Sequence, residues 1–220
     1  MAVTRTPTTT AVRTTATAVS EPMRRTSVKV SFVVGVVAVA AVLIVSLGVA
    51  SGGGHSGHRR ASGPFGWLHP AAPPTGWRLA RIPDGATLAY PPGWRPIETD
   101  PGTASAALLG GGGRFDAYLN ATPKGGTETA ANWSRFRPDH NRGEGNRDVR
   151  LLASARNLTF RSERGSCVID TYTTSKATFR EIACLVSGPT STAVVVAAAP
   201  NAGWEHQAAT LQRAVSSFVP

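Results

Sequence analysis

The feature that most constrains this chain is an uncharged apolar run near its N-terminus. Residues 30–50 read VSFVVGVVAVAAVLIVSLGVA and contain no charged residue, no proline and no amide side chain. As a helix these residues would extend about 31 Å, which matches the ~30 Å hydrocarbon core of a bilayer. Apart from the hydroxyls of Ser31 and Ser46, the run has no polar face to turn toward water. It therefore predicts a transmembrane helix over residues 29–50.

The charges on either side of this run predict its orientation. Four Lys or Arg residues lie within the twenty residues before it, and only two lie within the twenty after it. The cytoplasmic flank of a membrane span carries the excess of positive charge. Both cysteines, Cys167 and Cys184, follow the run, and an oxidising compartment would let them pair. We therefore expect a cell-membrane protein with a cytoplasmic N-terminus and an extracytoplasmic C-terminal part.

A cleaved signal peptide is the alternative interpretation of the same run. Gly48-Val49-Ala50 offers a cleavage site made of small residues. However, the run is longer than the 7–15 apolar residues usual in a signal peptide, and the tail before it is long. These lengths favour an uncleaved anchor.

Composition divides the rest of the chain into three parts. Residues 1–28 are rich in threonine and have no aromatic residue, which predicts a disordered cytoplasmic tail. Residues 51–74 are first glycine-rich and then proline-rich, which predicts a linker. Residues 75–220 form one domain that is long enough to bury a core. The linker's scattered histidines lack nearby cysteine or carboxylate ligands, so we expect no metal site and no cofactor.

The distribution of charge argues against a nucleic-acid partner. The formal net charge is +10, but residues 1–74 alone hold seven Lys or Arg residues and one acid. Most of the surplus therefore lies next to the predicted membrane span, where basic residues meet anionic lipid. The predicted domain is only mildly basic. The predominance of arginine over lysine, 20 to 3, is typical of a GC-rich bacterial genome.

Hydrophobic patterns in residues 75–220 predict an α+β domain, with a mostly antiparallel sheet packed by helices. Residues 192–199 (TAVVVAAA) are apolar on both faces, as in a central strand. A helix capped by Asn201 would follow, with an apolar stripe running from Trp204 to Phe218. A shorter helix capped by Thr127 would precede a polar loop that starts near Pro138. Further strands are predicted at residues 82–90, 94–98, 103–109, 114–122, 149–155, 157–161, 166–174 and 178–186.

Residues 77–219 resemble a known family. An apolar strand enters the sequence Tyr90-Pro91-Pro92-Gly93-Trp94, a strand meander and a helix follow, and a strand with a Trp-containing helix ends the chain. This order is similar to that of the PsbP-like and LpqN-like α/β/α sandwiches, the latter including actinobacterial cell-envelope proteins. The segment at residues 118–123 (YLNATP) and the two cysteines also resemble small extracytoplasmic domains of actinobacterial membrane proteins. The resemblance implies a binding or accessory role and supplies no catalytic residue.

The residues needed for catalysis do not form a recognisable motif. The sequence lacks the Gly-x-Ser-x-Gly motif of a nucleophile elbow. The predicted domain has two histidines, His140 and His206, and we expect both to lie on the surface. We therefore predict no catalytic residue and a non-enzymatic binding or interaction module of the cell envelope. Its partner would be an envelope protein, a lipid or a cell-wall ligand, and its oligomeric state stays open.

Two other functions remain open at this point: a cell-envelope hydrolase with an unrecognised site, and an accessory subunit of a membrane complex. A concave pocket with convergent polar groups would favour ligand binding. A nucleophile within about 3 Å of a base would favour the enzyme. A flat exposed apolar patch would favour the accessory role.

The two cysteines predict the register of a hairpin. If Ser175 and Lys176 form its turn, residues face each other when their numbers sum to 351. Cys167 and Cys184 meet that condition. We therefore predict a structural disulfide, which on the chain-entropy model contributes about 3 kcal/mol through the unfolded state.

The same register opposes Asp170 to Glu181 and Tyr172 to Phe179. Like charges directly opposite each other are destabilising, so we expect an arginine of this domain between the two acids. The nearest arginines in the sequence are Arg161, Arg164 and Arg180. An alternative, functional interpretation is that the two carboxylates accept a cationic ligand or partner residue beside the Tyr172–Phe179 pair.

Overall fold

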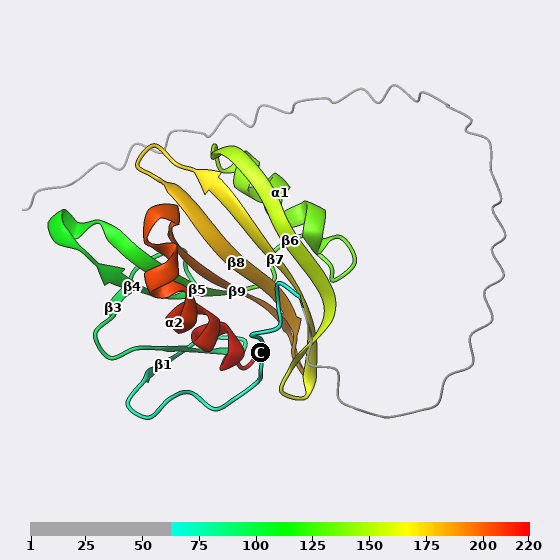
Figure 1. Ribbon diagram of the computed structural model, residues 1–220. Helices are drawn as coiled ribbons and strands as arrows, with labels where there is room; N and C mark the ends of the chain where they lie inside the picture. The colour runs from blue at the N-terminus through cyan, green and yellow to red at the C-terminus, as the bar shows by residue number, and fades with distance from the viewer. Residues whose placement is uncertain (1–62) are drawn as a thin grey trace, which may run out of the picture. The chain divides into compact units, whose positions relative to one another are not determined.

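The computed structural model describes residues 63–220 (Figure 1). The predicted tail, the predicted transmembrane helix and most of the predicted linker lie outside the described residues. Within residues 63–220, no helix combines the length and the apolar character needed to cross a bilayer.

A seven-stranded antiparallel sheet forms the centre of the domain, with strand order β3-β4-β5-β9-β8-β7-β6 (Figure 1). Its strands are β3 (Arg95–Ile97), β4 (Ala104–Leu109), β5 (Phe115–Pro123), β6 (Arg147–Phe160), β7 (Glu163–Thr173), β8 (Thr178–Ser187) and β9 (Thr192–Pro200). The short elements η1 (Gly111–Gly113) and η2 (Asn201–Gly203) follow β4 and β9. Strand β9 is fourth of the seven and buried on both faces, which confirms the predicted central strand.

Two helices cover opposite faces of this sheet, because the pleat directs alternate side chains to opposite sides. Helix α2 (Trp204–Ser216) packs with Ile169, Ile182 and Val195 in the main core cluster. Helix α1 (Trp133–Gly143) packs through Trp133 on Val168 and its neighbours, whose side chains project from the opposite face of the sheet. The predicted α+β architecture is therefore confirmed, with one helix on each side.

The α2 face carries most of the core. The two-stranded sheet of β1 (Arg78–Arg81) and β2 (Thr87–Tyr90) lies on this side, with Leu88 buried in the same cluster as Leu211 and Val215 of α2. Phe65, which we had placed in the linker, is also buried in this cluster. The packed part of the chain therefore begins before residue 75.

The predicted boundaries of helix α1 were wrong at both ends. Thr127 does not cap the helix; the N-cap is Asn132, which exchanges hydrogen bonds with Thr129. At the other end the helix continues through Pro138 to Gly143, where we had expected a loop. Pro138 costs the helix one hydrogen bond but is buried. Tertiary packing has therefore overridden the local proline signal.

Three other predicted boundaries also differ. The first half of the predicted strand 82–90 is a turn, in which the Ile82 amide bonds the Ala86 carbonyl. The two strands predicted around Arg156 are one bulged strand, β6, in which Asn157 adopts a φ of 59°. Asn201 begins η2 rather than capping α2, which starts after Gly203.

Candidate functional site

The β7–β8 hairpin has the register that the cysteines predicted. Cys167 faces Cys184 with their Cα atoms 4.1 Å apart, and the two form a disulfide in the core on the α2 side of the sheet. Asp170 faces Glu181 in the same register. Because residues 167 and 170 differ in parity, the two acids project from the opposite side, toward helix α1.

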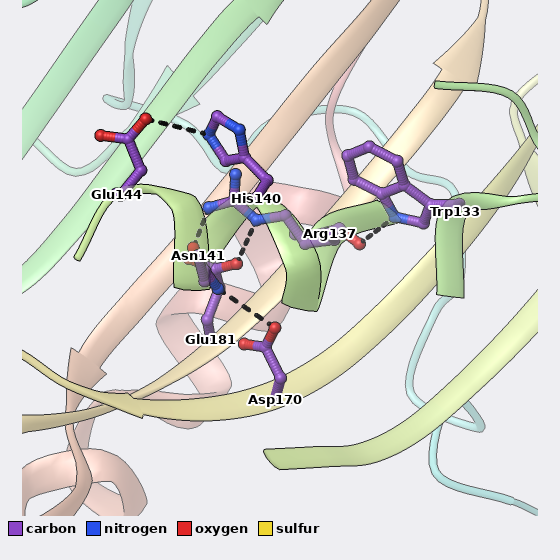
Figure 2. A network of polar contacts seen from close by, with 8 residues as sticks. Trp133, Arg137, His140, Asn141, Glu144, Asp170 and Glu181 are labelled. Atoms are coloured by element: carbon purple, nitrogen blue, oxygen red, sulfur yellow. Dashed lines mark hydrogen bonds and ion pairs between the residues drawn. The ribbon is translucent and has the colours of Figure 1, made fainter. Parts of the chain in front are cut away.

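The arginine expected between the acids is Arg137, from helix α1. Its Nε and Nη2 donate to the two carboxylate oxygens of Glu181 at 2.6 and 2.8 Å (Figure 2). The pair is largely buried, with side-chain exposures of 14% for Arg137 and 1% for Glu181. Two parallel hydrogen bonds between opposite charges make such a bidentate pair stronger than a single bond, and they also fix the orientation of both side chains.

The three arginines nearest in sequence were the wrong candidates. Arg180 adjoins Glu181 and therefore points to the other face, where it lies over the Trp204 ring at 5.0 Å. Arg164 bonds the Asn157 carbonyl and a hydroxyl of β6. Arg161 is exposed and lies in the β6–β7 turn with a φ of 52°.

Asp170 lies behind this ion pair and is completely buried. Asn141 of α1 donates its amide to Asp170 Oδ2 at 3.2 Å (Figure 2), while Oδ1 has no partner within the described part of the chain. Burial, together with the charge of Glu181, raises the pKa of Asp170 to about 7, although Arg137 opposes the shift. Burial also raises the pKa of the neighbouring Tyr172. Asp170 is therefore placed to stabilise the helix–sheet contact and not to contact solvent.

Helix α1 contacts the sheet through residues spaced four apart. Trp133 donates its indole N–H to the Ala183 carbonyl at 2.9 Å, Arg137 pairs with Glu181, and Asn141 bonds Asp170 (Figure 2). Residues at this spacing lie on one face of a helix. The three contacts therefore fix both the rotation and the position of α1 on β7 and β8.

A groove of about 900 Å³ lies beside α1 on this face of the sheet. Tyr118, Asn120 and Val196 lie on its β5 and β9 side, and Phe136 and Arg137 line its α1 side. The predicted site residues Glu181 and Tyr172 also line it, whereas Asp170 does not. Phe179 stacks on Tyr172 with ring centroids 5.8 Å apart but lines a second concavity near η2.

Hydrogen-bonded side chains form the rim of the groove beside β4. The Thr99 hydroxyl lies 2.6 Å from that of Thr103 and 2.8 Å from that of Ser105. Asn120 of β5 donates its amide to Ser105 at 2.8 Å. These polar groups are therefore already held in position, which is typical of a pre-formed binding site.

The two histidines of the predicted domain lie on opposite sides of the sheet. His140 is exposed on α1, with its Nε2 3.9 Å from a carboxylate oxygen of Glu144, and its ring stacks on Phe136. His206 is exposed on α2. Their predicted surface positions are confirmed, and the fold does not bring them together.

Sequence reasoning missed Arg137, Asn141 and Glu128 as residues of this face. The first two come from a helix segment that we had interpreted as a helix end and a loop. Their spacing of four and eight residues from Trp133 would have placed them on the same face of the helix. That inference requires the helix to continue past Pro138. Glu128 lies in the loop between β5 and α1 and carries no local signal.

Comparison with solved structures identifies the fold. No family model matches the sequence, and no curated protein matches it. The solution structure of cyanobacterial PsbP (CyanoP) from Synechocystis sp. PCC 6803 is similar, with a TM-score of 0.51 and 15% identity over 65% of this chain and 91% of that chain. LpqN of Mycobacterium tuberculosis, described as involved in cell envelope biogenesis, has a TM-score of 0.37 and 12% identity, covering 66% of this chain and 91% of LpqN. The similarity to CyanoP shows that this domain has a PsbP-like fold.

Proposed function

We propose that this protein is a single-pass membrane protein of the bacterial cell envelope, and that its extracytoplasmic domain is a non-enzymatic binding module. The observation that carries the proposal is the groove on the α1 face. It is concave, and its polar side chains are held by the Arg137–Glu181 pair and the Asn120–Ser105 bond. Concavity with a few fixed polar groups is the usual character of a ligand site.

Two features support the proposed location. The apolar run at residues 30–50 has the length and composition of a membrane anchor. The Cys167–Cys184 disulfide fits an oxidising compartment, because thiols in the cytoplasm are kept reduced. Both features favour a domain held at the outer surface of the membrane.

The non-enzymatic part of the proposal is supported by the arrangement of four ionisable groups on the α1 face. Both oxygens of Glu181 are occupied by Arg137, and Asp170 is shielded from the groove. His140 and Glu144 are exposed, and the 3.9 Å between them is too long for a hydrogen bond. These groups hold structure and shape a surface.

The test is cross-linking in intact membranes that carry the full chain. Thr122 lines the groove from β5, so Thr122→Trp should obstruct it. Leu79→Trp introduces the same side chain at an exposed position on β1 and is the matched control. We expect Leu79→Trp to give a cross-linked species of the same mass as the wild type. Thr122→Trp should give only the mass of the chain without a cross-linked partner. Identical cross-linking of both variants, at equal melting temperatures, would contradict the proposal.

A further inference from the structure

We infer that the groove binds an organic cation, an ammonium or guanidinium group, on the carboxylate of Glu128 beside the ring of Phe136. The inference rests on the proposed binding function of the groove and specifies the class of its ligand.

The charged residues that line the groove are mainly negative, although the chain as a whole is positively charged. Four acids line it: Asp100, Glu128, Glu144 and Glu181. Arg137 is the one arginine or lysine among its lining residues, and both of its contacting nitrogens are taken up by Glu181. In a chain of net charge +10, this groove is therefore a local acidic surface that repels anions and attracts cations.

Glu128 has the free acceptor that such a ligand needs. The residue is 5% exposed, and its Oε1 accepts a hydrogen bond from the Gly125 amide at 2.9 Å. Among residues 63–220, its buried Oε2 has no donor within hydrogen-bonding geometry. Unpartnered buried carboxylate oxygens are costly and rare, so this oxygen calls for a donor that the described chain does not supply.

The surroundings of Glu128 keep it charged. Burial acts to raise its pKa, but the backbone amides of Glu128 itself, Gly125 and Gly126, together with the charge of Lys124, outweigh burial and lower it. Lys124 itself donates to the Gly126 carbonyl at 2.6 Å and forms no ion pair with Glu128 within 4 Å. The carboxylate is therefore charged, and Lys124 does not neutralise it by a direct ion pair.

An aromatic surface lies next to this carboxylate. A Cβ added at Gly126 would lie 2.8 Å from Glu128 Oε2 and 3.9 Å from Phe136 Cζ, so the carboxylate and the ring approach the same point. Phe136 continues into a stacked series with Trp133 and His140, with centroid separations of 6.0 and 6.2 Å. A carboxylate near an aromatic ring suits an organic cation, because the charged head pairs with the carboxylate and the adjoining carbon atoms contact the ring.

A metal ion fits the same residues less well. Among residues 63–220, no three His, Cys, Asp or Glu side chains converge in a way that could hold a metal. Hard cations require several oxygen ligands, whereas Glu128 offers one free oxygen next to a hydrocarbon ring. The donor set therefore matches an organic cation.

The test titrates the full chain, in a neutral detergent, with spermidine and with the peptide acetyl-Lys-Gly-Lys-amide. The uncharged 1,8-octanediol, of similar length to spermidine, is the ligand control. Glu128→Gln keeps the acceptor for Gly125 but removes the charge, so we expect binding at least about tenfold weaker. Glu205→Gln removes one charge from the exposed surface of α2 and should bind as wild type does. Gly126→Ala keeps the charge but crowds Oε2, and it should also weaken binding.

The outcomes separate this inference from the proposed function. Saturable binding of spermidine that Glu128→Gln weakens supports a small amine; binding of the peptide alone supports a basic side chain of a polypeptide. Binding of the diol at equal strength, no binding of either cation, or equal binding by Glu128→Gln and Glu205→Gln would overturn the inference. In those cases, loss of cross-linking in Thr122→Trp would still uphold the groove as a binding site.

Discussion

The two faces of the central sheet differ in how they are packed. On the α2 face, buried aliphatic and aromatic side chains such as Leu211 and Phe218 surround the disulfide. On the α1 face, the helix is held by an ion pair and amide contacts, and a groove is left open beside it. One face therefore supplies stability by apolar burial, and the other positions polar groups at some cost in desolvation. This division predicts different responses to mutation.

The largest effect is expected on the α2 face. Leu211 is completely buried in the main core cluster, so Leu211→Ala should reduce the free energy of unfolding by about 2–5 kcal/mol. Denaturant melts of the full chain measure this loss. Spermidine binding at a temperature where the variant stays folded should be unchanged. A large change in that binding would show that the two faces are energetically coupled.

A somewhat smaller and pH-dependent effect is expected from Arg137→Met on the α1 face. The variant leaves Asp170 and Glu181 opposed and without a positive charge, which should cost about 3 kcal/mol near neutral pH. The pKa of Asp170 should then rise further in the folded state, because Arg137 no longer opposes the shift. Stability lost at pH 7 should therefore be partly recovered at pH 5, as Asp170 protonates.

The control for this variant removes all three charges together. Arg137→Met combined with Asp170→Asn and Glu181→Gln should be closer to wild type than Arg137→Met alone at pH 7. Denaturant midpoints across pH 5–8 compare the variants. A triple variant as unstable as Arg137→Met would contradict the assignment of Arg137 as the counter-ion of the acid pair.

The smallest effect is the contribution of Asp170 to the pH dependence of the wild-type domain. Its pKa is raised to about 7 in the folded protein, above the value of about 3.9 expected when unfolded. Between these values the folded state binds more protons, so stability falls as pH rises, by at most about 1.4 kcal/mol per pH unit. Asp170→Asn should remove that slope between pH 5 and 7. An unchanged slope would assign the titration to another group.

Local patterns predicted much of the β-sheet. The register of β7 and β8 followed from two cysteines and a two-residue turn, because one turn position fixes every opposed pair in a hairpin. The central position of β9 followed from its two apolar faces. Both predictions depended on residues that are close together in the sequence.

The candidate site was less predictable because its residues come from distant segments. Asp170 and Glu181 were identified by the hairpin register, but Arg137 lies 44 residues from Glu181 and reaches it only because α1 packs on β7. The proline at position 138 concealed that helix, since proline normally ends a helical pattern. The groove depends on the space that α1 leaves uncovered, which no local pattern describes.

The edges of the sheet have a consequence for self-association. One edge strand, β3, has only three residues and includes Pro96, which lacks an amide donor. The other, β6, changes register three times along its pairing with β7, and such bulges interrupt the row of outward-facing backbone groups. A strand from a second copy of the chain could therefore not form a regular series of backbone hydrogen bonds with either edge. Neither edge of the sheet therefore offers a template for a further strand, which protects a β-rich domain from fibrous aggregation.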